Sequence, residues 1–422
     1  MFARNQVMKR KPSEGELLRD YLHRYLYDQE LGFFSKLPLL EAPKQSFNGF
    51  KSRAEYDQTY ERIVKQQGGK FVTPSELFRP WYGASVARWA MTQHQLMEQN
   101  QPLRIYEVGA GNGSTAEDCL VYLKKHHPDV YDSCVYTVIE VSHAMANTQK
   151  MRLAGFMDEG RAELFRGSIM DWENLVEDPC CVVALEVLDN MPHDKVVLMQ
   201  DSVFQTHVVT NVDGNSKFEI VPIQDEKILR ALYYWRAKKG YKDPSSFTPT
   251  FCMKWLIGKF RNLMPLGDGE YFVPSVGVDF LHKLAHRFPQ HSLLLSDFEF
   301  LPRCIPGMNG PLVQSYKPQR VHMCISDAPM YECDVVFPTD FSCLMGAYED
   351  VCLKRSRVST HMQFVDEYGF PDKTELTDGS NPMRETYENV IYFTSCFKDV
   401  IEDPEPIEPG ETVHKEQEMI QQ

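Results

Sequence analysis

Three glycines separated by single residues, Gly109, Gly111 and Gly113, follow a short apolar stretch and precede a helix-forming run. Glycines in a strand-to-helix turn let the backbone bend sharply and approach a ligand closely. Their spacing is G-x-G-x-G, whereas the dinucleotide-binding fingerprint is G-x-G-x-x-G, and Ser114 stands where its third glycine belongs. A Gly-rich turn alone is a weak signal, so its meaning depends on the acidic residues near it.

Three acids follow the ends of successive predicted strands. Glu107 lies two residues before the first glycine, where a carboxylate would repel a pyrophosphate but attract the cationic amino group of S-adenosyl-L-methionine. Glu140 can accept both ribose hydroxyls, as it would in a dinucleotide site as well. Asp171 can bind the adenine amino group, or it can instead cap the helix that follows. Together the three acids favour S-adenosyl-L-methionine as the cofactor; the alternatives are helix-capping acids in a doubly wound fold and an NAD(P)-dependent oxidoreductase.

A second acidic group lies in the segment Leu185 to Asp194. Glu186 and Asp189 follow a predicted strand, where side chains converge on the ligand crevice of a parallel sheet. They can hold a guanidinium by charge-assisted bidentate hydrogen bonds and orient one nitrogen toward a methyl group. We therefore predict Glu186 and Asp189 as catalytic residues. The alternative is that both are turn residues before Pro192, and His193 is interpreted as a loop residue and not a base.

Alternating strand and helix patterns predict the elements that position these residues. Apolar runs separated by helical periodicity are typical of βαβ units and a parallel sheet. The predicted strands are 103–108, 135–139, 162–165, 181–185, 292–297 and 392–397, and the predicted helices are 114–125, 142–153, 171–176, 230–238 and 278–288. The fold class is therefore α/β, with a Rossmann-like sheet, an N-terminal helical extension and an inserted substrate lobe; the family resemblance described below implies seven strands in that sheet. The expected organisation is a basic N-terminal segment (1–16), a helical extension (17–100), a cofactor-binding core (101–205), an inserted lobe (206–275), the rest of the core (276–401) and an acidic tail (402–422).

The composition limits the classes of function. The net charge is −14, which disfavours a nucleic-acid partner because binding a phosphate backbone needs clustered Lys and Arg. An acidic protein can suit a cationic substrate, or the charge can serve solubility alone. The 11 Cys are scattered without a C-x2-C pair, so we expect reduced thiols and no metal site. No apolar run approaches the length of a membrane span. The basic N-terminus fits part of a mitochondrial transit peptide or a plain disordered start.

The motifs taken in order resemble those of the MidA-like methyltransferases. The segment 107–118 resembles the glycine motif and following helix of that family, and the segment 186–192 resembles its motif after the fourth strand. The order of the landmarks is more specific than any one motif. The other matching segments are Leu31-Gly32-Phe33-Phe34, Phe71-Val72-Thr73 with Glu76, Val138-Ile139-Glu140-Val141-Ser142, Asp297 and Asp340-Phe341. The resemblance implies Thr73, Glu76 and Ser142 as further cofactor-binding residues. It also implies a protein arginine substrate, a link to mitochondrial complex I assembly and a mitochondrial location, with the cytoplasm as the alternative.

Two departures from that pattern concern the acceptor side. Leu185 stands where the family has Asn, and Asn190 stands where it has Ala. Donor binding should tolerate both changes, whereas the identity of the acceptor is less secure. The resemblance implies a methyltransferase that modifies a protein substrate, such as a complex I subunit. The alternatives are a non-catalytic assembly factor that keeps the fold and a paralogue with another substrate.

Overall fold

The structure is a computed structural model of the 422-residue chain. It describes residues 15–35, 50–66, 73–98, 101–199, 202–210, 216–237, 269–302, 304, 310–316, 319–322, 324–329 and 331–401. The expected acidic tail and most of the expected basic N-terminal segment lie outside the described residues.

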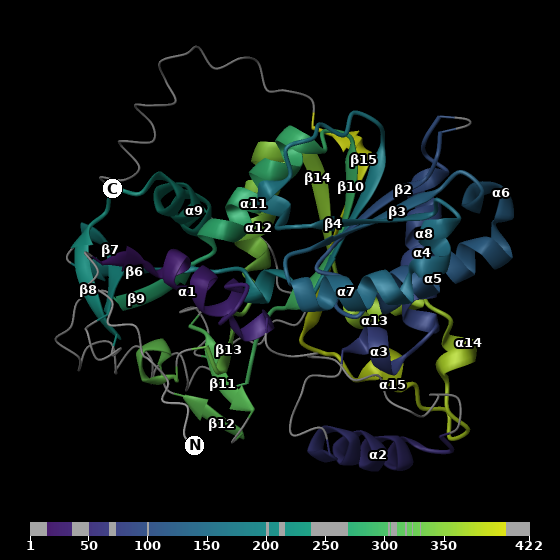
Figure 1. Ribbon diagram of the computed structural model, residues 1–422, viewed down its shortest axis with the longest axis horizontal. Coiled ribbons are helices and arrows are strands. Elements are labelled where there is room, and N and C mark those ends of the chain that lie inside the picture. Colours follow the sequence, from purple (N-terminus) through teal and green to yellow (C-terminus); the bar gives the residue numbers. More distant parts are fainter. Residues whose placement is uncertain are drawn as a thin grey trace, which may run out of the picture.

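A seven-stranded sheet forms the centre of the fold (Figure 1). Its strands are β2 (Arg104–Val108), β3 (Val135–Glu140), β4 (Ala162–Arg166), β5 (Cys180–Leu185), β10 (His291–Phe298), β14 (Lys354–Thr360) and β15 (Val390–Val400). The order is β14-β15-β10-β5-β2-β3-β4, and only β15 runs antiparallel to its neighbours. The chain reverses its direction of winding between β2 and β5. The carboxyl ends of these two strands are therefore the switch point at which α/β folds bind ligands. The predicted Rossmann-like fold class is confirmed.

The central strands are apolar on both faces. In β5, Cys180, Val182 and Ala184 pack in one buried cluster while Cys181 and Val183 pack in the cluster on the opposite face. Because side chains alternate along a strand, a strand covered on both faces reads as a continuous apolar run. This explains why the unbroken run before Leu185 predicts a buried central strand.

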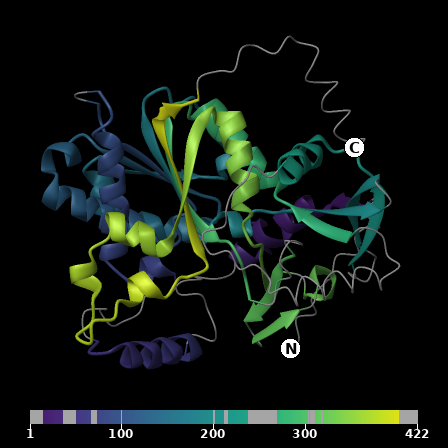
Figure 2. The ribbon, with the colours of Figure 1, turned by 180° about the vertical axis from the view of Figure 1, so that it is seen from behind.

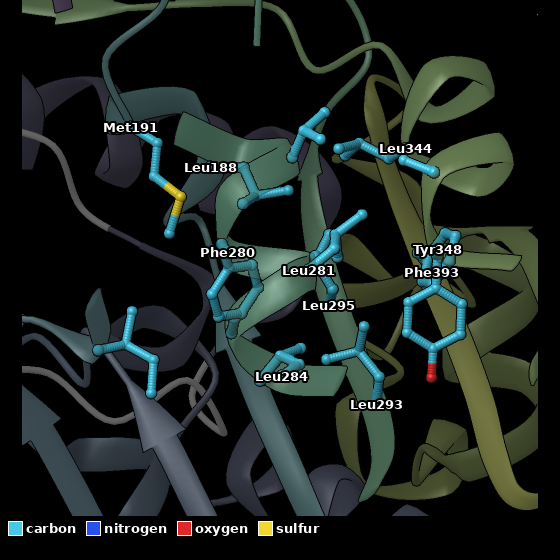
Figure 3. Packing of buried hydrophobic residues seen from close by; sticks show 14 of the residues in the cluster. Leu188, Met191, Phe280, Leu281, Leu284, Leu293, Leu295, Leu344, Tyr348 and Phe393 are labelled. Atoms are coloured by element: carbon cyan, nitrogen blue, oxygen red, sulfur yellow. The ribbon is translucent and has the colours of Figure 1, made fainter. Parts of the chain in front are cut away.

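Helices cover both faces of the sheet. One face packs against α4 (Trp81–His94), α5 (Ser114–His126) and α13 (His361–Tyr368), and the other against α11 (Ser275–Arg287) and α12 (Phe341–Cys352). Seen from behind, α12 lies along the β14–β15 edge (Figure 2). Figure 3 shows Leu188 and Met191, from the loop after β5, extending toward Phe280 of α11. The loop that carries Glu186 and Asp189 is thus fixed by apolar anchors.

The inserted lobe contains two further sheets. One comprises β1 (Glu16–Leu17), β6 (Asp194–Met199), β7 (Ser202–Thr210), β8 (Ser216–Pro222) and β9 (Gly269–Val273), and the other β11 (Leu312–Tyr316), β12 (Gln319–His322) and β13 (Cys333–Val336). The expected boundary at residue 206 falls inside β7. Strand β6, which begins at Asp194, pairs with β7 and β9 and with no described strand of the central sheet. The segment 276–401, expected to be the rest of the core, also includes the lobe strands β11, β12 and β13.

The N-terminal extension is not one unit. Helix α1 (Leu18–Tyr27) packs into the lobe, in a cluster with side chains of β7, β11 and β13, whereas α2 (Arg53–Gln66), α3 (Pro74–Leu77) and α4 pack near the central sheet. Buried Arg19 attaches α1 to the lobe through ion pairs with Asp194 (2.7 Å) and Asp225 (2.6 Å). The extension therefore connects the lobe to the core.

One helix expected from the sequence is wrong. Segment 171–176 is not a helix; a 3₁₀ turn ends at Asp171, and the chain continues without regular secondary structure. The Trp172 ring packs against Tyr106, Phe165 and Phe288, which draws this segment toward the sheet. The remaining elements are α6 (Pro128–Tyr131), α7 (His143–Arg152), α8 (Ala154–Asp158), α9 (Glu226–Ala237), α14 (Pro371–Thr374) and α15 (Pro382–Glu385). Among the described ranges, no helix meets the length and hydropathy that a membrane span requires.

Candidate active site

A cavity of about 400 Å³ lies at the carboxyl ends of β2, β3, β5 and β10. It is lined by six carboxylates from separate parts of the chain: Glu107, Glu140, Asp171, Glu186, Asp189 and Asp334. Among the described residues of its wall there is no Lys or Arg. The cavity is therefore strongly acidic and suited to cationic groups.

The structure brings together most of the residues predicted from the sequence. Those that line this cavity are Thr73, Glu107, Gly109, Gly111, Glu140, Ser142, Asp171, Glu186 and Asp189. Two predicted residues, Glu76 and Gly113, do not line it. Gly113 is the N-terminal cap of α5, with φ 78°. Buried Glu76 accepts a hydrogen bond from the Ser114 hydroxyl. Gly113 therefore ends the glycine turn, and Glu76 contacts the first residue of the helix that follows it.

The glycine turn requires glycine for two reasons. Gly109 and Gly111 have φ values of 68° and 54°, which other residues rarely adopt. A Cβ atom on Gly109 would also lie 3.0 Å from Cγ2 of Val187. The turn therefore presents bare backbone to the cavity, as close approach to a ligand requires.

Glu107 lines the cavity near the end of β2, with 2% of its surface exposed. The hydroxyl of Tyr136 donates a hydrogen bond to its Oε2 (3.0 Å). Burial, together with the charge of Glu140, raises the pKa of Glu107 to about 7, although the Tyr136 hydrogen bond opposes the shift. A cation bound here would restore a low pKa, because an opposite charge favours the ionised carboxylate.

Glu140 is held at the end of β3 by two donors. Its Oε1 accepts from the backbone N–H of Ser142 (2.8 Å), and its Oε2 accepts from Nε2 of Gln149 (2.8 Å). The same Gln149 amide group donates to the carbonyl of Gly111 (2.8 Å), so one side chain fixes both the acid and the glycine turn. Burial raises the pKa of Glu140, and these hydrogen bonds oppose the shift.

Asp171 lies at the exposed rim of the cavity. The alternative that Asp171 is a helix N-cap is wrong, because Ser168 is the N-cap of its 3₁₀ turn. Asp171 is the partner in a capping box and accepts from the backbone N–H of Ser168 (3.3 Å). Its carboxylate is thereby oriented at the rim.

Glu186 and Asp189 line the cavity from the loop after β5. Glu186 has φ 54°, a strained value for a residue with a side chain. Burial, and then the charge of Asp297, raises the pKa of Glu186 to about 8. Burial and the charges of Asp297, Asp334 and Glu186 also raise the pKa of Asp189 well above its ordinary value. Oδ1 of Asp189 is buried and has no hydrogen-bond partner among the described residues.

Several wall residues were not predicted from the sequence. They are His23, Tyr27 and Phe34 at the end of α1 and beyond, Tyr82 of α4, Asn190, and Asp334 of β13. Nδ2 of Asn190 donates to Oδ1 of Asp334 (3.0 Å), and the Tyr27 hydroxyl donates to the Asn190 carbonyl (3.0 Å). Phe34 belongs to the segment Leu31-Gly32-Phe33-Phe34, which resembles a landmark of the family. Nothing in the sequence around Asp334 indicated that the lobe places a carboxylate in this wall.

The comparisons with known proteins agree with this geometry. A family model described as "Putative S-adenosyl-L-methionine-dependent methyltransferase" matches residues 85–359. The chain is 25% identical over 319 residues to the Schizosaccharomyces pombe protein named "Protein arginine methyltransferase NDUFAF7 homolog, mitochondrial". That match covers 71% of this chain and 66% of the relative, so the chain spans slightly less than two thirds of the relative's length.

Two solved structures from Burkholderia thailandensis share the fold. One is a methyltransferase candidate bound to S-adenosyl-homocysteine (TM-score 0.58, 16% identity, covering 91% of this chain and 89% of that one). The other is a native structure from the same superfamily (TM-score 0.55, 14% identity, covering 90% and 87%). The matched family region contains the glycine turn, the acids at the ends of β2 and β3, the acids after β5, and Asp334. The chain belongs to this family of S-adenosyl-L-methionine-dependent methyltransferases, whose cofactor is S-adenosyl-L-methionine.

Proposed function

We propose that the protein methylates a guanidinium nitrogen of an arginine in a protein substrate. The observation that carries this proposal is the buried, unpartnered Oδ1 of Asp189 beside Glu186, in a cavity whose described wall has no Lys or Arg. A buried carboxylate oxygen without a partner is unfavourable until a donor reaches it. A guanidinium supplies several N–H donors in a planar fork that matches carboxylates.

The other acids of the cavity fit the methyl donor. Glu107 would bind its amino group, Glu140 its ribose hydroxyls and Asp171 its adenine, with the bare backbone of the glycine turn alongside. The fit rests on the space that a Cβ at Gly109 would fill and on the buried position of Glu107. When bound, S-adenosyl-L-methionine supplies a methyl group on a positively charged sulfur, which leaves as a neutral thioether.

The chain's own contribution to the reaction is to orient the acceptor and remove a proton. In the proposed step a guanidinium nitrogen forms the new N–C bond with the methyl group, and the proton on that nitrogen passes to Glu186. A carboxylate with a pKa near 8 is a better proton acceptor than an ordinary one at neutral pH. Asp189 would hold the remaining N–H groups, which keeps one nitrogen directed at the donor.

The finer identity of the substrate is part of the proposal. The name of the S. pombe relative, which includes both arginine methylation and the mitochondrion, supports a protein arginine acceptor and a mitochondrial location. A complex I subunit as the substrate protein rests on the sequence resemblance.

A second candidate function is a binding factor that keeps the donor site without turnover. The observation in its favour is Leu185, which lines the cavity where the resembling family has a polar Asn. In that case the protein would bind S-adenosyl-L-methionine and transfer no methyl group to any acceptor.

The proposal is tested by methyl transfer to a library of arginine-containing peptides, and to the same peptides with lysine in place of arginine. We expect mass increments on arginine only, and loss of transfer in Glu186→Gln with donor affinity retained. Glu163→Gln is the control, because Glu163 is an exposed carboxylate of β4 that does not line the cavity. Equal transfer to the lysine peptides, or full activity of Glu186→Gln, would refute the proposal.

A further inference from the structure

We infer that Asp297 is a positioning residue whose carboxylate holds the loop after β5, so that Glu186 and Asp189 face the cavity together. Asp297 does not line the cavity. The inference rests on the proposed function in one respect, which is that Glu186 and Asp189 are the residues that meet the acceptor.

The contacts of Asp297 are directed at the backbone of that loop. Asp297 is fully buried near the end of β10. Its Oδ2 accepts from the backbone N–H of Asp189 (3.0 Å), and its Oδ1 accepts from its neighbour Phe298 (2.8 Å). Burial raises the pKa of this carboxylate, whereas the backbone N–H groups of Val187 and Leu188 lower it. One side chain thus accepts a hydrogen bond from the loop at Asp189 and interacts with the N–H groups of the two residues before it.

The loop needs such an anchor because its conformation is unfavourable by itself. Glu186 has a left-handed φ of 54°, which persists only where the surroundings impose it. Other anchors lie on either side: the Glu186 N–H donates to the carbonyl of Ser296 (2.8 Å), and the Phe337 N–H donates to the carbonyl of Asp189 (2.8 Å). Between these two backbone hydrogen bonds, the carboxylate of Asp297 holds the loop by accepting the N–H of Asp189.

Asp297 also sets the charge environment of Glu186. The groups that interact electrostatically with Glu186 are Asp297 of β10, Asp189 of the same loop, Tyr60 of α2, Tyr82 of α4, Tyr387 and Tyr392 of β15. Burial raises the pKa of each of these tyrosines, so they stay neutral where Glu186 titrates. The carboxylates are therefore the charged neighbours, and the charge of Asp297 keeps the pKa of Glu186 high.

The test is Asp297→Asn, with Asp340→Asn as the matched control. Asp340 also uses a carboxylate to accept a backbone N–H, that of Cys343 (3.1 Å), where it caps α12, but it does not line the cavity. For Asp297→Asn we expect donor affinity close to that of the unaltered protein and a kcat lower by about 10²-fold, the scale of a small misplacement of a reacting group. The control should keep its kcat.

A second readout separates positioning from a general structural role and does not depend on methyl transfer. In protein carrying ¹³C-carboxyl glutamate, the Glu186 signal (assigned with Glu186→Gln) should titrate at lower pH in Asp297→Asn than in the unaltered protein and in Asp340→Asn. If Asp297→Asn does not fold, the titration of the unaltered protein tests the inference instead. Its Glu186 signal should show two steps, because the carboxyl groups of Glu186 and Asp297 titrate as a pair.

The outcomes distinguish this inference from the proposed function. If the unaltered protein methylates no arginine peptide, the proposed function fails, and the Glu186 titration still tests the influence of Asp297. If Asp297→Asn keeps both its kcat and its Glu186 titration, the inference fails while the proposed function stands. A single-step titration of Glu186 near the ordinary glutamate pKa in the unaltered protein would also overturn the inference.

Discussion

The hydroxyl of Tyr136 on β3 donates a 3.0 Å hydrogen bond to Oε2 of Glu107 on the neighbouring strand β2. Both side chains are buried, so this hydrogen bond offsets part of the desolvation of the Glu107 carboxylate. The compensation is incomplete, because the pKa of Glu107 remains near 7. Glu107 is therefore poised to ionise when a cationic amino group binds beside it.

Donor affinity should depend on pH through Glu107. The carboxylate attracts the donor's ammonium group only when ionised, so affinity should increase as the pH rises through about 7. The donor should be titrated calorimetrically at several pH values between about 5.5 and 7.5. This range lies below the pKa of an α-amino group, so the donor keeps its positive charge. Glu107→Gln should bind about 10- to 100-fold more weakly and without this dependence, since a charge-assisted hydrogen bond is lost. An identical pH dependence in Glu107→Gln would contradict the role of Glu107.

Glu186→Gln should stabilise the unliganded protein while removing methyl transfer. The pKa of Glu186 is about 8 in the folded protein, above the ordinary value of 4.5, so the folded state favours the protonated form. Its contribution to stability is fully present below pH 4.5 and is lost as the pH rises through 8. The melting temperature of Glu186→Gln relative to the unaltered protein should therefore increase over this range. A difference that is independent of pH would mean that folding does not raise the pKa of Glu186.

Removing the Arg19 side chain should destabilise the protein strongly. Arg19→Met leaves Asp194 buried without its cation, which typically costs about 3–5 kcal/mol. The control is Arg53→Met, whose ion pair with Asp57 is partly exposed and is worth about 0–1 kcal/mol. Urea denaturation followed by circular dichroism measures both. Equal losses in the two variants would show that the Arg19 ion pairs do not hold α1 on the lobe.

The sheet could be predicted from the sequence because its signals are local. The apolar runs of β2, β3, β5 and β10, each preceded or followed by a helical pattern, are sufficient to indicate a parallel sheet. The acids Glu107 and Glu140 could be assigned for the same reason, since the carboxyl end of a parallel strand points to the ligand crevice. The order of the strands then brings these acids together.

The lobe and its share of the wall could not be predicted in the same way. Asp334 reaches the cavity because β13 pairs with β11 and the turn at Asn190 contacts β13, and such non-local pairing leaves no periodic pattern in the sequence. The same holds for Tyr27, which is brought to Asn190 by the packing of α1 on the lobe. Asp297 could be noted as a strand-end acid, but its contact with the backbone of Asp189 depends on the pairing of β5 with β10.

The central claim is that the glycine turn and its neighbouring acids bind S-adenosyl-L-methionine, and calorimetric titration of that compound tests it most directly. Gly109→Val places a side chain at φ 68° against Val187, whereas Gly160→Val imposes similar backbone strain at φ 70° where a Cβ would meet nothing within 4 Å. We predict that the unaltered protein and Gly160→Val bind the donor and that Gly109→Val shows no measurable binding. Binding by Gly109→Val with unchanged affinity, or no binding by the unaltered protein, would contradict the account.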